Sequence, residues 1–253
     1  MATLCCESHR FESIQAVLFD KDGTLARVET YLAAVGMARW QLLCDKESAL
    51  AGGPGSHRGA PLLAAFGLCD GKVDPAGLLA VGSRQENEVA AAAYLAAAGW
   101  DWIVALEVAK AAFDEAARRS QPKAAKTPLV EGVRPLLARL SRAGIHAGIV
   151  SADLQAEVSA FIEYNGLAEI SWYCGASAST LPKTHPAFLR FACDAMGVEP
   201  SATLVIGDSA ADWQLAQCGA AGFFGMTGGW SSVPEIGPDV VAIAQFSQIE
   251  CLP

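Results

Sequence analysis

The sequence predicts an α/β fold in which a doubly wound, mainly parallel sheet forms the core and an all-helical domain is inserted into it. Three observations lead to this prediction. Short apolar runs recur along the chain, helical segments follow most of them, and one long internal stretch shows helical patterns without a strand signal. Strands that alternate with helices are typical of parallel sheets covered on both faces, so the stretch without strands indicates an insertion.

The core strands are predicted from three nearly continuous apolar runs, residues 16–19, 145–150 and 203–206. Strands buried on both faces of a parallel sheet are apolar at almost every position, not at every second one. Two more strand candidates, residues 222–226 and 240–243, follow toward the end of the chain.

The core helices are predicted from segments with helical periodicity between or after these strands. Glycines at positions 144, 166 and 197 come just past the ends of three of them, where a left-handed residue closes a helix. The predicted core helices are residues 130–142, 154–165, 186–196 and 210–218.

Residues 26–125 form the predicted insertion, which leaves residues 1–25 and 126–253 for the core. Residues 52–55, Gly-Gly-Pro-Gly, interrupt its helices. This cluster fits a surface turn, or a mobile loop that brings His57 or Arg58 over a substrate. The helical segments predicted in the insertion are residues 29–49, 61–66, 85–98 and 101–119.

Composition and charge exclude several classes of function. The chain of 253 residues has 18 basic and 27 acidic side chains, a net charge of −9, which makes nucleic acid an unexpected partner. Its most apolar stretch, residues 89–98, is shorter than the roughly 20 residues that span a bilayer, so no membrane segment is expected. The eight cysteines include no C-x-x-C pair, and we expect reduced thiols in a cytoplasmic protein.

Polar side chains follow each of the three main strands, and the second is followed by Ser151-Ala152-Asp153. Asp20 and Asp22 come directly after the first strand, and Asp208 and Asp212 follow the third. The carboxyl ends of neighbouring parallel strands meet at one edge of the sheet, where ligands bind. Four carboxylates repel one another unless a cation shares the site, and hard oxygen ligands suit Mg²⁺. The pattern therefore predicts a magnesium site at this edge.

The segments around these residues resemble the four motifs of the haloacid dehalogenase-like phosphatases, in order and in approximate spacing. The helical insertion follows the first motif, where one subgroup of that family carries a helical cap that determines substrate specificity, and phosphoglycolate phosphatase-like members are the nearest pattern. The matching residues are Asp20-Lys21-Asp22-Gly23-Thr24-Leu25 for the first motif, Ser151 for the second, Lys183 for the third and Gly207-Asp208-Ser209-Ala210-Ala211-Asp212 for the fourth.

The resemblance implies a Rossmann-like core and a Mg²⁺-dependent phosphatase that acts on a small phosphorylated metabolite. Asp20 would attack phosphorus and form an aspartyl-phosphate, and Asp22 would act as acid and then as base. The Asp20 carboxylate, the Asp22 main-chain carbonyl and Asp208 would bind Mg²⁺, with Asp212 and Ser209 in support. The residues expected to bind the substrate phosphate are Ser151, Ala152, Lys183, Gly23 and Thr24.

Some alternatives stay open at this point. A phosphotransferase or mutase of the β-phosphoglucomutase type shares all four motifs, and a non-enzymatic protein that binds a phosphorylated ligand would keep the same fold. Ser151 could also be the N-cap of the helix that follows it, and Lys183 taken alone could be a solvated surface lysine. The sequence names neither the substrate nor the oligomeric state.

Overall fold

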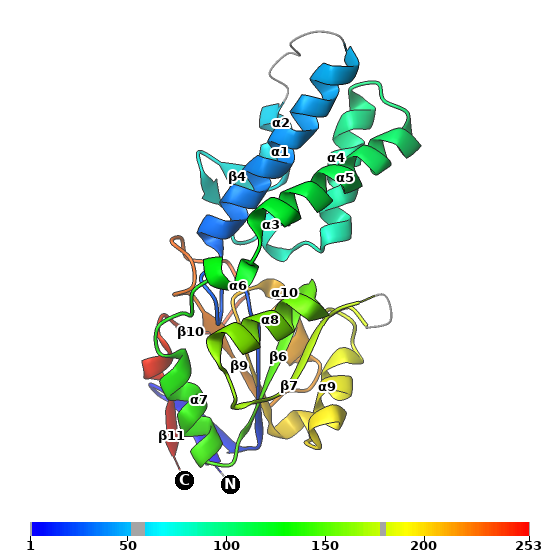
Figure 1. Ribbon diagram of the computed structural model, residues 1–253. Coiled ribbons are helices and arrows are strands. Elements are labelled where there is room, and N and C mark those ends of the chain that lie inside the picture. Colours follow the sequence, from blue (N-terminus) through cyan, green and yellow to red (C-terminus); the bar gives the residue numbers. More distant parts are fainter. Residues whose placement is uncertain (1, 52–58, 178–180, 253) are drawn as a thin grey trace. The chain divides into compact units, whose positions relative to one another are not determined.

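The computed structural model describes residues 2–51, 59–177 and 181–252, so the glycine-rich cluster at 52–55, His57 and Arg58 lie outside the described residues. The chain divides into two compact units (Figure 1). One unit, the core unit, comprises residues 1–28 and 124–253, and the other, the helical unit, comprises residues 29–123.

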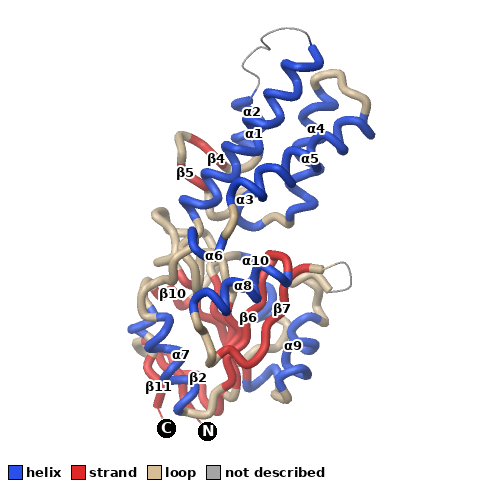
Figure 2. The backbone as a smooth tube through the Cα atoms, in the orientation of Figure 1, coloured by secondary structure: helices blue, strands red, loops and turns tan. Residues whose placement is uncertain are grey.

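A six-stranded parallel sheet forms the centre of the core unit (Figure 2). Its strand order is β10-β9-β8-β3-β6-β7. Strand β3 lies between β6 and β8, so the segments that leave the carboxyl ends of these three strands are neighbours. This sheet confirms the predicted α/β fold class. The strands are β3 (Ala16–Phe19), β6 (His146–Leu154), β7 (Ile170–Ala176), β8 (Thr203–Gly207), β9 (Gly222–Met226) and β10 (Val241–Ile243).

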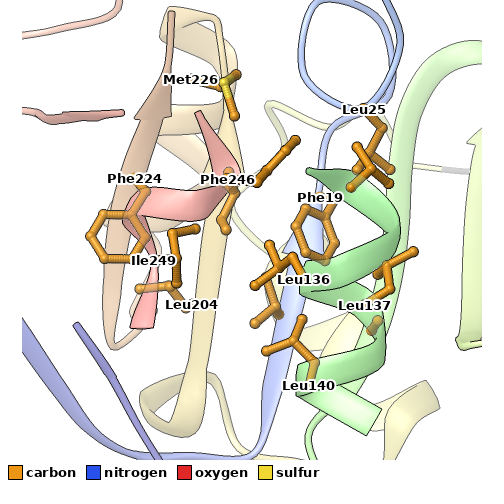
Figure 3. Packing of buried hydrophobic residues seen from close by; sticks show 14 of the residues in the cluster. Phe19, Leu25, Leu136, Leu137, Leu140, Leu204, Phe224, Met226, Phe246 and Ile249 are labelled. Carbon is orange, nitrogen blue, oxygen red and sulfur yellow. The ribbon is translucent and has the colours of Figure 1, made fainter. Parts of the chain in front are cut away.

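Helices cover both faces of this sheet because its central strand is apolar on both sides. Val17 and Phe19 belong to one buried cluster, which includes side chains of α7 and α8, and Figure 3 shows Phe19 beside Leu136 of α7. Leu18 belongs to a second cluster, which includes side chains of α9 and α10. Successive strand residues point to opposite faces, which explains the division. The helices are α7 (Val133–Arg142), α8 (Gln155–Asn165), α9 (Phe188–Met196) and α10 (Ala210–Gln217).

A second, three-stranded antiparallel sheet joins the two ends of the chain and was not predicted. Strand β1 (Ala2–Cys6) pairs with β2 (His9–Ile14) on one side and with β11 (Glu250–Leu252) on the other. Leu4 of β1 and Ile14 of β2 are buried in the same cluster as Phe19. This small sheet therefore extends the core of the unit.

The helical unit consists mainly of helices, with one short hairpin that the sequence pattern did not indicate. The hairpin pairs β4 (Leu68–Cys69) with β5 (Lys72–Val73). Small side chains such as Ala91 and Ala109 are buried in α4 and α5. The helices are α1 (Glu29–Ala51), α2 (Gly59–Ala65), α3 (Leu78–Val81), α4 (Arg84–Ala97) and α5 (Trp102–Ser120), and α6 (Lys123–Lys126) follows.

Two short 3-10 helices, η1 (Pro200–Ala202) and η2 (Phe246–Gln248), complete the core unit. In the part of the chain that the structure describes, no helix combines the length and the apolar character needed to traverse a bilayer.

Candidate active site

Three buried carboxylates lie together beyond the carboxyl ends of β3 and β8. Asp20 follows β3, Asp208 follows β8, and Asp212 is in the first turn of α10. One carboxylate oxygen from each lies within 4.8 Å of those of the other two, and all three residues are buried. The Asp20 main-chain N–H donates to the Ile206 carbonyl at 2.8 Å, so the first residue after β3 is still bonded to β8.

Burial and mutual repulsion raise the pKa of two members of this trio. The pKa of Asp20 is well above its usual value, mainly because of burial, with Asp212 and Asp208 adding to the rise and Lys183 opposing it. The pKa of Asp208 is raised to about 7, again mainly by burial and then by Asp212. Buried carboxylates with this charge excess are the hard-oxygen donors that Mg²⁺ binds, so the residues fit such an ion.

Lys183 lies beside the trio and supplies part of the missing positive charge. Its ammonium group donates to Asp20 at 2.5 Å and forms an ion pair with Asp212. Its side chain is only 12% exposed. Burial lowers the pKa of Lys183, but Asp20 and Asp212 outweigh that effect and raise it above its usual value. Lys183 is therefore a charged part of the site and not a solvated surface lysine.

Asp208 is held by one hydrogen bond to each carboxylate oxygen. The Thr24 hydroxyl donates to Oδ1 at 2.7 Å, and the Trp230 indole N–H donates to Oδ2 at 2.7 Å. Trp230 belongs to the loop after β9 and is buried. Carboxylate oxygens carry two lone pairs each, so these bonds orient Asp208 and leave it able to bind a cation.

Two glycines let the loops around Asp208 approach one another. Gly23 has φ +85°, and a Cβ there would lie 2.3 Å from both Asp208 Oδ2 and Trp230 Nε1. A Cβ on Gly229 would lie 1.7 Å from the Gly23 carbonyl oxygen. The turn after β3 and the loop that carries Trp230 are thus in direct main-chain contact, which only residues without a side chain permit.

Asp212 is the third residue of a capping box at the start of α10. The Ser209 hydroxyl accepts from the Asp212 N–H, and Asp212 Oδ2 accepts from the Ser209 N–H at 3.0 Å. Its other oxygen, Oδ1, pairs with Lys183. Asp212 therefore links the helix N-terminus to Lys183.

Asp22 lies in a separate ion-pair group. Lys21 is buried and forms ion pairs with Asp22 and with Asp153, the latter at 2.8 Å. The Asp22 side chain is partly exposed, and its carboxylate is not part of the trio. The Ser151 hydroxyl accepts from the Asp153 N–H at 3.1 Å. Helix α8 begins at Gln155 with Leu154 as its N-cap, so the alternative that Ser151 caps this helix is wrong.

The structure thus places most of the residues singled out in the sequence in two groups of neighbouring side chains. Asp20, Asp208, Asp212 and Lys183 form one, bordered by Gly23, Thr24 and Ser209. Asp22 and Ser151 belong to the other, whereas Ala152 is exposed and no side-chain role is assigned to it. Sequence reasoning assigned no role to Lys21, Asp153 or Trp230. The only signal for Trp230 was the glycine-rich loop after a predicted strand.

Comparison with known proteins shows the family to which the chain belongs. The model of the haloacid dehalogenase-like hydrolase family matches residues 14–219, which include all four motifs. The chain is a haloacid dehalogenase-like hydrolase. In this haloacid dehalogenase-like hydrolase, Asp20 follows β3 and Asp208 follows β8.

Solved structures share the fold of this haloacid dehalogenase-like hydrolase at low sequence identity. A predicted phosphoglycolate phosphatase from Haemophilus somnus 129PT is 18% identical, with a TM-score of 0.61 over 88% of this chain and 89% of that one. A subfamily IA hydrolase of the same superfamily from Geobacter sulfurreducens PCA is 19% identical, with a TM-score of 0.57 over 93% and 94%. CbbY from Rhodobacter sphaeroides, solved in complex with phosphate, is 17% identical, with a TM-score of 0.51 over 92% and 95%. No curated protein matches the chain.

Proposed function

We propose that this hydrolase is a Mg²⁺-dependent phosphatase that uses Asp20 as a nucleophile on a small phosphorylated metabolite. One observation carries the proposal: the Asp20 carboxylate lies among buried carboxylates and next to the Lys183 ammonium group. This arrangement gives a nucleophile, a set of cation ligands and a positive charge for a phosphoryl oxygen within one site.

The reaction would proceed in two steps. First, an Asp20 oxygen attacks phosphorus, the bond from phosphorus to the leaving oxygen breaks, and Asp22 donates a proton to that oxygen. Second, water attacks the aspartyl-phosphate while Asp22 takes its proton, so that phosphate and free Asp20 result. Asp20, Asp208 and the Asp22 main-chain carbonyl would hold Mg²⁺, which when bound offsets the negative charge of the nucleophile and the phosphate.

The other site residues would bind and orient the phosphoryl group. Lys183 would neutralise one phosphoryl oxygen while it remains paired with Asp212. The Ser151 hydroxyl and the main chain near Ala152 and Gly23 would bind the others. The Thr24 hydroxyl already donates to Asp208, so we assign it to holding this cation ligand instead of the phosphate.

The helical unit, residues 29–123, would act as the cap that determines specificity. Fold-level similarity does not identify a substrate, so phosphoglycolate is one member of a panel to be tested and not a conclusion. A cytoplasmic location stays a prediction.

The experiment is a panel of phosphorylated metabolites, assayed for phosphate release with Mg²⁺ and with a chelator. We expect Mg²⁺-dependent turnover that Asp20→Asn abolishes, because the amide is not nucleophilic. The matched control is Asp194→Asn, the same change at an exposed position on α9, which should keep full activity.

Four outcomes would contradict the proposal. Full activity of Asp20→Asn would refute the nucleophile, and turnover that survives the chelator would refute the cation. Transfer of phosphate to a sugar hydroxyl, with no free phosphate, would indicate a mutase. Binding without turnover in the wild type would indicate a non-enzymatic protein.

A further inference from the structure

Lys21 is a buried cation that the mechanism above does not use. It lies between the proposed nucleophile Asp20 and the proposed acid Asp22 in the sequence, and its side chain is only 1% exposed. Its ammonium group forms ion pairs with Asp22 Oδ1 and Asp153 Oδ2, the latter at 2.8 Å. It also lies 5.3 Å from the ring centroid of Phe161 of α8.

These contacts distinguish Lys21 from Lys183, the lysine proposed to neutralise a phosphoryl oxygen. Lys183 pairs with Asp20 and Asp212, whereas Lys21 pairs with Asp22 and Asp153. Burying an ammonium group costs free energy unless carboxylates compensate it, and here two carboxylates do so. Lys21 therefore has a different task from that of Lys183.

Lys21 connects the turn after β3 with the carboxyl end of β6. Asp22 is in the turn after β3, and Asp153 is near the end of β6. The Asp153 N–H donates to the Ser151 hydroxyl, so the same connection reaches the second motif. The cation also keeps two carboxylates close that would otherwise repel each other.

We propose that Lys21 is a positioning residue, which holds the Asp22 carboxyl group in the orientation needed to protonate the leaving oxygen. The inference rests on the proposed phosphatase function and deepens it. Lys21 contacts Oδ1 of Asp22 and so fixes the rotation of the carboxyl group. In the protonation step the bond from Asp20 to phosphorus forms, the bond to the leaving oxygen breaks, and the proton of the Asp22 carboxyl group moves to that oxygen.

The test compares two esters that differ in their need for an acid. Phenyl phosphate has a basic leaving oxygen that must be protonated. The leaving group of dinitrophenyl phosphate, dinitrophenolate, departs without a proton. The measured quantity is kcat/KM at saturating Mg²⁺, because it covers the steps up to departure of the leaving group. A role confined to folding would change both values equally.

For Lys21→Met we expect kcat/KM for phenyl phosphate to fall about 100-fold, in the range that general acids contribute. The kcat/KM for dinitrophenyl phosphate should fall less than about threefold, because its leaving group needs no acid. Asp22→Asn should show the same selective loss. Lys21→Arg should restore most of the kcat/KM for phenyl phosphate. Lys110→Met, at an exposed position of α5, is the matched control and should change neither value.

Equal losses for both esters in Lys21→Met would overturn the inference. If that variant does not fold, Asp153→Asn removes one of the two partners of Lys21 from a partly exposed position. It should shift the ratio of the two kcat/KM values in the same direction, by about threefold, as expected for a weakened hydrogen-bond network. An unchanged ratio there would also overturn the inference. A wild type that hydrolyses no phosphate ester would instead refute the proposed function.

Discussion

At the scale of single residues, Asp208 combines burial, two fixed hydrogen bonds and a raised pKa. Thr24 and Trp230 donate to its two oxygens and lower its pKa, but burial and Asp212 outweigh them and bring it to about 7. In the cation-free protein, Asp208 therefore holds a proton below that pH. A divalent cation has to displace this proton before it binds.

The apparent affinity for Mg²⁺ should therefore rise with pH. One proton with a pKa of about 7 predicts about tenfold tighter binding at about pH 8 than at about pH 6, and little further change above. The pKa of Asp20 is raised as well, which adds to the effect in the same direction. Titration calorimetry in buffers of different ionisation enthalpy would measure both the affinity and the protons released.

The raised pKa of Asp208 also makes the stability of the cation-free protein depend on pH. Since the folded pKa of Asp208 exceeds the ordinary value of about 3.9, the folded cation-free protein binds more protons than the unfolded chain between these two pKa values. The contribution of Asp208 to the free energy of unfolding therefore falls as pH rises through this window. An affinity for Mg²⁺ that stays constant or declines with pH would contradict the account.

Single residues also show where sequence reasoning ends. Asp20 and Asp208 were predictable because each directly follows an apolar strand, and adjacent parallel strands end at the same edge. Trp230 was not, because it reaches Asp208 from a loop after another strand and belongs to no recognised motif. The pairing of Asp22 with Lys21 was not predictable either, since adjacent residues in a turn have no fixed side-chain geometry.

At the scale of elements, the main-chain contact between Gly23 and Gly229 couples two loops of the core unit. The loop after β9 carries Trp230, and the turn after β3 carries Asp22. A side chain at position 229 would collide with the Gly23 carbonyl oxygen, which is main chain and cannot rotate away. The two loops would then have to separate, and Trp230 would move away from Asp208.

Gly229→Ala should therefore weaken Mg²⁺ binding about tenfold, as expected when a residue that orients a metal ligand is displaced. Calorimetry on the chelator-treated protein measures this directly. Gly144→Ala is the control, because Gly144 has φ +69° and a Cβ there would meet nothing within 4 Å. That change strains the main chain but should leave the cation affinity unaltered; equal effects from both variants would argue against the coupling.

Elements were predictable where local signals are strong. The bounds of β3 and β9 agree with the predicted 16–19 and 222–226, and Gly166 and Gly197 close α8 and α9 with left-handed φ values. Strand β7 was missed because most of its residues are only partly buried, so its sequence is not a continuous apolar run. Strand β2 was missed because four of its six positions are exposed.

At the scale of the whole molecule, the two ends of the chain form part of the core. Strands β1 and β11 are almost the full length of the chain apart, and such a pairing leaves no local pattern in the sequence. Leu4 of β1 is fully buried in the cluster that contains Phe19. The ends of the chain should therefore contribute to the stability of the core unit.

Leu4→Ala should lower the free energy of unfolding by about 2–4 kcal/mol, because it removes buried methyl groups and leaves a cavity. Urea unfolding followed by circular dichroism measures the change. Val233→Ala, at a position that is 77% exposed, should change it by less than about 0.5 kcal/mol. If Leu4→Ala lowered the free energy of unfolding as little as Val233→Ala, the terminal strands would not stabilise the core.

The pairing of Thr3 with Leu252 has a practical consequence for engineering. Because these residues are neighbours, a short peptide linker could join β11 to β1, and the chain could be reopened at the exposed Asp70–Gly71 turn of the β4–β5 hairpin. Such a circular permutant would retain every strand of both sheets in the core unit. It would also carry any fused tag on the helical unit instead of beside β1 and β11.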